Sequence, residues 1–80
     1  MPRKISKIEY LALVEELGFV LVDEFGDYKV FHHSRDRTRR FVQQFAVWDI
    51  DIEDVLAQLE EVWVSKEEVE NAYERLFSNS

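Results

Sequence analysis

One feature constrains the fold of this chain most: helical and strand-like hydrophobic patterns follow one another in a fixed order. Apolar residues recur at helical spacing over residues 10–17, β-branched and aromatic stretches occupy 19–48, and helical spacing returns over 52–77. Two glycines and one proline leave few places for long loops, so short turns must join the strands. The pattern predicts an α+β fold of order α-β-β-β-α-α, in which helices pack against a three-stranded antiparallel sheet.

Capping signals and turn residues set the limits of these elements. Ser6 with Glu9 and Ser65 with Glu68 have the spacing of capping boxes, and Gly18 suits the left-handed residue that ends a helix. We expect one domain over residues 1–80. The predicted elements are helix 1 at about 6–17, strands at about 19–24, 28–33 and 38–48, helix 2 at about 51–63 and helix 3 at about 66–77.

Composition removes several classes of function. The chain has no cysteine, which excludes disulfides, thiolate chemistry and cysteine-ligated zinc. No signal peptide is recognisable, and no stretch approaches the roughly 18 apolar residues of a membrane span. We therefore expect a cytoplasmic protein without a membrane partner. The sequence also shows no phosphate-binding glycine loop and no metal-ligand spacing, so we expect neither a cofactor nor a metal.

The net charge of −7 is concentrated in the last third of the chain. Residues 1–48 hold seven acidic and eight basic side chains, a net of +1, whereas residues 49–80 hold ten acidic and two basic ones, a net of −8. Helix first turns, where the helix dipole favours negative charge, account for about half of these acids. The predicted partner-binding acidic face consists of Asp49, Asp51, Glu53, Asp54, Glu60, Glu61, Glu67, Glu70 and Glu74. The alternative is a solvated face that keeps the protein soluble.

Residues 8–33 resemble the N-terminal part of the HicA-type toxin family. The step from helix to strand, Leu17-Gly18-Phe19, and the stretch from Gly26 to His33 carry the likeness. The resemblance implies a fold like that of double-stranded-RNA-binding domains. It also implies ribonuclease activity through the histidine of a Gly-Ser-His motif, but this chain has Tyr28 at that position. Because a phenol with a pKa near 10 does not readily exchange protons at neutral pH, we expect the fold without the enzymatic activity.

The remaining polar and aromatic candidates have structural alternatives. His32 and His33 are neighbours on a predicted strand, so they point to opposite faces and do not chelate one metal together. Trp48 and Trp63 flank helix 2, where core packing is the default, although an exposed Trp63 would be an interface anchor. The one basic cluster could touch phosphates or pair with the protein's own acidic helices. It consists of Arg35, Arg37, Arg39 and Arg40.

These observations favour a non-enzymatic binding protein. We expect the acidic face to engage a basic surface of a protein that handles nucleic acid, as a nucleic-acid mimic does. The layout and charge are similar to those of some anti-CRISPR proteins, which suggests an inhibitor of the phage or mobile-element type, although no motif is shared. Two alternatives remain. One is a HicA-like RNA-binding protein of a toxin–antitoxin system that uses the arginine cluster, and the other is a homodimeric adaptor.

Overall fold

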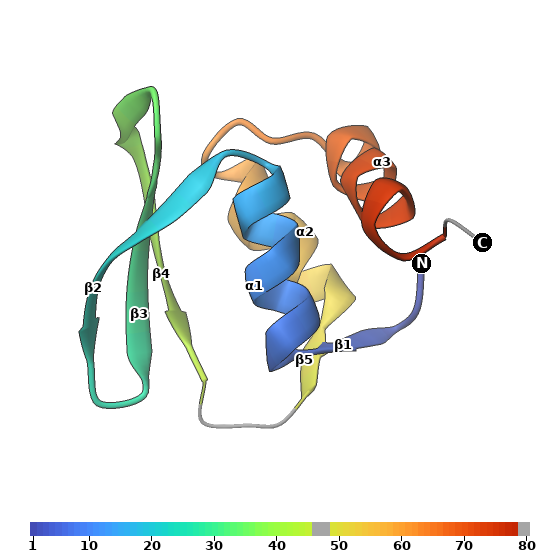
Figure 1. Ribbon diagram of the computed structural model, residues 1–80, viewed down its shortest axis with the longest axis horizontal. Coiled ribbons are helices and arrows are strands. Elements are labelled where there is room, and N and C mark those ends of the chain that lie inside the picture. Colours follow the sequence, from blue (N-terminus) through green and yellow to red (C-terminus); the bar gives the residue numbers. More distant parts are fainter. Residues whose placement is uncertain (46–48, 79–80) are drawn as a thin grey trace.

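The computed structural model describes residues 1–45 and 49–78 and shows an α+β fold (Figure 1). Helix, three strands and two helices follow one another as predicted, and the structure adds two short strands that the sequence did not reveal. The elements are β1 (Lys4–Ser6), α1 (Lys7–Glu16), β2 (Phe19–Phe25), β3 (Tyr28–His33), β4 (Asp36–Gln44), β5 (Asp49–Asp51), α2 (Ile52–Glu60) and α3 (Lys66–Phe77).

The predicted three-stranded antiparallel sheet is confirmed, with strand order β2-β3-β4. Gly26, with a φ of 59°, turns the chain between β2 and β3. One residue more lies on β2 than on β3 between Leu21 and Asp23, so the strand carries a bulge at Val22. The third strand begins at Asp36 rather than at residue 38. Its predicted end, with Trp48, falls on residues 46–48, which lie outside the described residues.

A second, two-stranded sheet joins β1 to β5 and was not predicted. The strands pair antiparallel, with Ile5 opposite Ile50, and both side chains are buried. The backbone N–H of Ile52 also donates to the carbonyl of Arg3, at 2.8 Å. Three-residue strands have too little periodicity to be recognised, and their pairing joins segments about 45 residues apart. This small sheet attaches the start of the chain to the start of α2.

Both predicted capping boxes are present. At the start of α1, Ser6 Oγ accepts from the Glu9 N–H and the Ser6 N–H donates to the Glu9 carboxylate, at 3.1 and 2.8 Å. Ser65 and Glu68 make the same reciprocal pair at the start of α3. Because α2 ends at Glu60 and Ser65 caps the start of α3, α2 and α3 are separate helices, as predicted.

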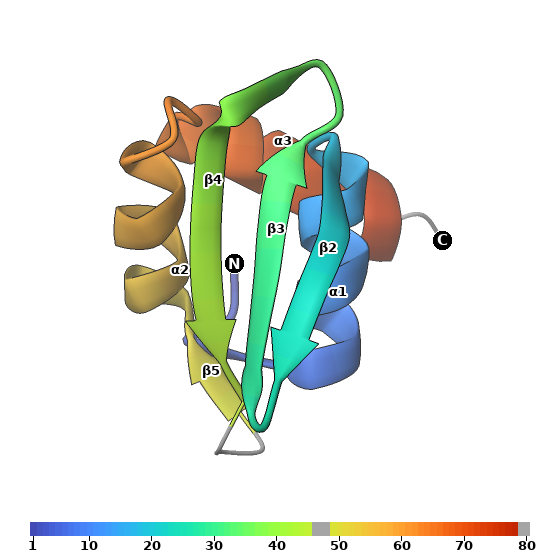
Figure 2. The same ribbon diagram turned by 90° about the vertical axis from the view of Figure 1, so that its left-hand side faces the viewer.

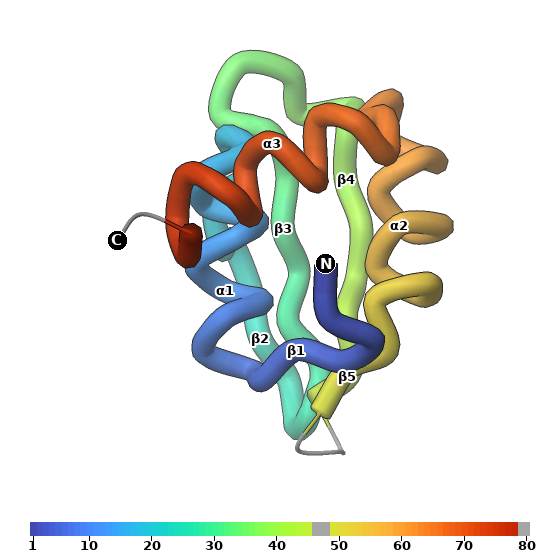
Figure 3. The backbone as a smooth tube through the Cα atoms, turned by 90° about the vertical axis from the view of Figure 1, so that its right-hand side faces the viewer, coloured from blue at the N-terminus to red at the C-terminus, as the bar shows by residue number. Residues whose placement is uncertain are grey.

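The elements form layers, with the sheet on one side, α1 and α2 in the middle and α3 on the far side (Figure 1). Figure 2 looks onto the sheet face that no helix of the described residues covers, and Figure 3 looks onto α3 and the N-terminus from the opposite side. The core lies between the sheet and the helices. Its buried side chains are Ile5, Tyr10, Leu13, Val14, Phe19, Phe31, Phe41, Ile50, Ile52, Val55, Leu59, Val62, Val64, Val69 and Ala72.

Tyr10 joins the middle layer to the sheet. Its ring packs edge-on against Phe31 and Phe45, at centroid distances of 6.2 and 5.4 Å. Its hydroxyl donates to Gln58 Oε1 on α2 at 2.6 Å, and the Gln58 amide nitrogen donates to the Val42 carbonyl on β4 at 3.1 Å. One glutamine therefore links α1, α2 and the sheet. Within the described residues no helix is long and apolar enough to cross a membrane.

Candidate functional site

The end of α2 places a tryptophan in an unusual backbone conformation. The Trp63 N–H donates to the Glu60 carbonyl at 3.0 Å, and the Val64 N–H donates to the Leu59 carbonyl at 2.9 Å. This pair of bonds is the Schellman motif, which requires a left-handed residue after the helix. Trp63 supplies it with a φ of 66°, alone among the non-glycine residues described. The prediction that helix 2 extends to residue 63 is therefore wrong, because the left-handed turn ends it at Glu60.

Glycine would occupy this position at less cost, since a Cβ in the left-handed region costs roughly 1–2 kcal/mol. Burial on both sides holds the turn in place. Val62 and Val64 are 5% and 2% exposed and belong to the core, whereas Trp63 between them is 68% exposed. The fold thus presents a large aromatic ring to solvent from a strained position. Such outliers are retained where the surrounding structure enforces them, often for function.

Arg39 on β4 contacts the same turn through its side chain. Its Nε donates to the Val62 carbonyl at 2.7 Å, and its guanidinium lies 5.7 Å from the centre of the Phe19 ring. The other three arginines of the predicted cluster lie elsewhere, in the β3–β4 turn and on the exposed side of β4. Sequence reasoning missed the role of Arg39, and no local signal could have revealed it, because the contact spans 23 residues.

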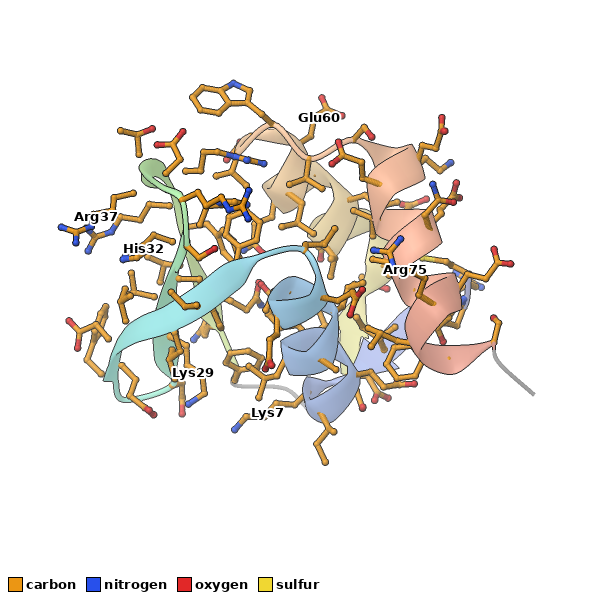
Figure 4. The ribbon with its side chains drawn as sticks, turned by 45° about the horizontal axis from the view of Figure 1, so that its top comes forward. Lys7, Lys29, His32, Arg37, Glu60 and Arg75 are labelled. Atoms are coloured by element: carbon orange, nitrogen blue, oxygen red, sulfur yellow. The ribbon has the colours of Figure 1, made fainter. Side chains whose placement is uncertain are left out.

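Four carboxylates surround the exposed ring along the chain. Residues 60–68, which we call the Trp63 loop, contain four acids and one base, a net of −3. Glu60 and Glu61 are exposed at the C-terminal end of α2, where the helix dipole disfavours negative charge. Glu67 is also exposed, and Glu68 is engaged in the capping box. Figure 4 shows Glu60 at the edge of the molecule where α2 ends.

The other predicted acids lie at the opposite end of α2 and along α3. Asp51, Glu53 and Asp54 line a shallow pocket of about 310 Å³ together with the first three residues of the chain, including Arg3. Glu70 and Glu74 line another such pocket beside Met1. All nine predicted carboxylates are exposed, Asp49 included. The part of the acidic face outside the Trp63 loop is therefore split in two, and the N-terminus lies between its α2 and α3 parts (Figure 3).

Asp51 lies at the start of α2 without capping it through its side chain. It occupies the N-cap position, but its side chain makes no capping hydrogen bond. Glu53 and Asp54 lie in the first turn, where the dipole stabilises them.

The remaining arginines lie on and beside the uncovered side of the sheet. Arg35 is in the β3–β4 turn, and Arg37 and Arg40 are exposed on β4. In Figure 4, Arg37 and His32 both lie on the side of the sheet away from the helices. The ion pairs within the described residues are Lys29–Glu24 and Arg75–Glu16, so the expected pairing of the cluster with the acidic helices is not seen there.

The two histidines make local contacts. His33 Nδ1 accepts from the Arg35 N–H at 3.1 Å, and its ring meets Phe19 edge-on. His32 Nδ1 lies 3.0 Å from the His33 carbonyl oxygen. Tyr28 stacks on Phe25 at a centroid distance of 5.6 Å. No group of three or more histidine or acidic side chains that could hold a metal occurs within residues 1–45 and 49–78.

Four ionisable groups have a pKa shifted further from neutrality, among them Tyr73, whose pKa is raised by burial and by the charge of Glu9. Hydrogen bonds from Thr38 lower the pKa of Asp36, and the hydrogen bond and charge of Lys29 lower the pKa of Glu24. Burial raises the pKa of Tyr10. None of these shifts brings a group toward the pKa near 7 that favours acid–base catalysis.

Comparisons with protein-family models, with curated proteins and with solved structures found no match to this chain.

Proposed function

We propose that this chain is a non-enzymatic binding protein whose Trp63 loop engages a basic surface of a protein that handles nucleic acid. The observation that carries the proposal is Trp63 itself, 68% exposed and held at a φ of 66°. A tryptophan at this position lowers stability relative to glycine and leaves a large apolar area in water. Binding of a partner that covers the ring offsets both the lower stability and the exposure of the apolar area. Tryptophan is among the commonest anchors of protein interfaces.

The charges around the Trp63 ring indicate which side chains a partner would present to it. Glu60, Glu61 and Glu67 are exposed and have no ion-pair partner within 4 Å among the described residues. The local net of −3 attracts lysine and arginine side chains, and the total of −7 favours encounter with basic partners over a longer range. An aromatic anchor with an acidic rim fits a basic groove that otherwise holds phosphates. Occupying such a groove would inhibit nucleic-acid binding, which is the action of a phage-type inhibitor.

The first experiment compares the wild-type chain with Trp63→Gly. Glycine suits the left-handed position, so this variant removes the ring while preserving the turn. Both proteins are immobilised and exposed to a nuclease-treated bacterial lysate, and proteins retained only by the wild type are identified by mass spectrometry. Each is then purified and titrated by calorimetry. We expect at least about a tenfold loss of affinity on Trp63→Gly, the effect of an interface hot spot.

Salt and competition test the electrostatic part. Raising NaCl from about 50 to 300 mM should weaken the interaction several-fold, because exposed charges are screened. A short DNA duplex should compete with the chain for the purified partner. The double variant Glu60→Gln/Glu61→Gln should weaken binding and reduce its salt dependence. The variant Glu15→Gln/Asp27→Asn, which changes two exposed carboxylates outside the Trp63 loop, serves as the matched control of equal charge. Affinity unchanged by salt and by the α2 substitutions would refute the proposal.

A further inference from the structure

The side of the β2-β3-β4 sheet that points away from the helices carries an apolar patch, which we call the open sheet face. Phe31 and Phe41 are opposite each other and face the core, so alternation points the residues on either side of them outward. The strand register arranges the outward side chains in three cross-strand rows. The rows are Val20, His32 and Arg40; Asp23, Val30 and Val42; and Phe25, Tyr28 and Gln44.

Most apolar side chains on this face are exposed to solvent. Phe25 is 54% exposed, Val42 46%, Val20 42% and Tyr28 40%. Val30 is only 3% exposed, although it does not belong to the core cluster, because it lies at the centre of the sheet between its cross-strand neighbours. Together with their polar neighbours in the same rows, these side chains make up a surface on the order of 500 Å². A patch of that size on a small protein commonly marks an interaction site.

The charge distribution selects a second copy of this chain as the occupant. The strongly acidic residues 49–80 supply α2 and α3, and α3 lies on the far side of the molecule from the open sheet face (Figure 1). Residues 1–48, which supply the sheet, are nearly neutral. Two copies that meet through this face keep their acidic helices far apart, whereas contact through α3 would bring like charges together. We propose that two copies pack open face to open face in a symmetric dimer.

The arrangement of the rows selects the symmetry axis. A two-fold axis in the plane of the interface and perpendicular to β3 places the row of Arg40 over the row of Tyr28 in the second copy. Val20 then covers Phe25, His32 covers Tyr28 and Arg40 covers Gln44. The central row meets itself, which pairs Val30 with Val30 and Val42 with Val42 and places the two Asp23 carboxylates opposite one another on the edge strand β2. An axis parallel to β3 would instead set Arg40 over Val20 and Phe25 over the polar Gln44. The perpendicular axis therefore pairs the apolar side chains of the face with one another and places the Arg40 guanidinium beside the Tyr28 ring, and added salt screens the two Asp23 carboxylates.

The area limits the strength of the dimer. Covering on the order of 500 Å² on each copy buries about 1,000 Å² in total, the lower limit for a specific interface. We therefore expect dissociation in the micromolar range. Because each copy carries −7, added salt screens their mutual repulsion and strengthens the dimer. This response is opposite to that of the Trp63 loop, so the two surfaces can be tested independently.

Sedimentation equilibrium at about 10–500 μM protein, in low and high salt, tests association. The variant Val42→Lys places a charge at the centre of the face, and Ile8→Lys, on an 80% exposed residue of α1, is the matched control. We expect a salt-strengthened dimer for the wild type and for Ile8→Lys, and at least tenfold weaker association for Val42→Lys. Circular dichroism establishes that each variant is folded. A wild type that stays monomeric throughout this range, or a dimer that Val42→Lys leaves intact, would overturn the proposal.

Cross-linking tests the axis. The chain has no cysteine, so Val42→Cys introduces a single thiol. The perpendicular axis places the two thiols across the interface from one another, within reach of a short bis-maleimide, and Ile8→Cys should give no cross-linked dimer. A dimer in which Val42→Cys fails to cross-link would refute this packing. A monomeric wild type that binds a fluorescent single-stranded RNA, with binding lost on Arg40→Glu, would instead identify the face as a nucleic-acid surface and overturn the dimer.

Discussion

Because the backbone at Trp63 is left-handed, we predict that glycine stabilises the fold relative to alanine at this position, the reverse of its effect inside a helix. We compare Trp63→Ala with Trp63→Gly, because both variants lose the indole ring and differ in the Cβ alone. A Cβ in the left-handed region destabilises the folded Trp63→Ala variant by roughly 1–2 kcal/mol. The greater conformational freedom of glycine in the unfolded chain offsets about 0.5–1 kcal/mol of this difference between the two variants. Trp63→Gly should therefore be more stable than Trp63→Ala by about 0.5–1 kcal/mol, or roughly 2–8 °C in Tm for a domain of this size.

Urea denaturation followed by circular dichroism measures the difference, and thermal unfolding checks it. Ala57 provides the matched control, because it is exposed within α2, where helical backbone favours alanine. There, Ala57→Gly should lower the free energy of unfolding by about 1 kcal/mol. The same exchange of alanine for glycine thus has opposite signs six residues apart. If Trp63→Ala proved as stable as Trp63→Gly, the turn would not be left-handed in solution, and the argument that Trp63 is held at a stability cost would fail.

Two further experiments test how α1 and the sheet are joined. Gly18→Ala should destabilise the fold more than Gly26→Ala: both have positive φ, but a Cβ at Gly18 would lie 2.8 Å from His33 Nε2, whereas at Gly26 it meets open space. We expect about 2 kcal/mol or more against about 1 kcal/mol in urea denaturation, and equal losses would contradict the close packing. Tyr10→Phe removes the hydroxyl that donates to Gln58 and should lower the free energy of unfolding by about 1 kcal/mol. An unchanged midpoint of urea denaturation would show that this hydrogen bond does not form.

The sequence predicted the meander and both capping boxes because their signals are local. A capping box joins residues three apart, and the β2–β3 turn needs one residue with positive φ, which Gly26 provides. The pairing of β1 with β5 could not be predicted in the same way, since Ile5 and Ile50 lie 45 residues apart and no local signal joins them.

The candidate site was predicted in part. Trp63 was recognised as an anchor if exposed, but its position outside α2 was not, because a Schellman turn without glycine has no sequence signature. Charge counting identified the acids but not their division into two groups, because that depends on where the N-terminus lies. The open sheet face was not predicted, because the exposure of Val20 and Val42 depends on helices covering only one side of the sheet.

The small β1–β5 sheet has a consequence for the order of folding. During synthesis Ile5 is made 45 residues before Ile50, which at about 5–20 residues per second is a delay of roughly 2–9 s. The helix and hairpin between them contain mostly local contacts and can form within that interval, whereas the first strand must wait without a partner. Closure of the core around Ile5 is then a late event, and β1 is the segment that a nascent or partly unfolded chain exposes longest.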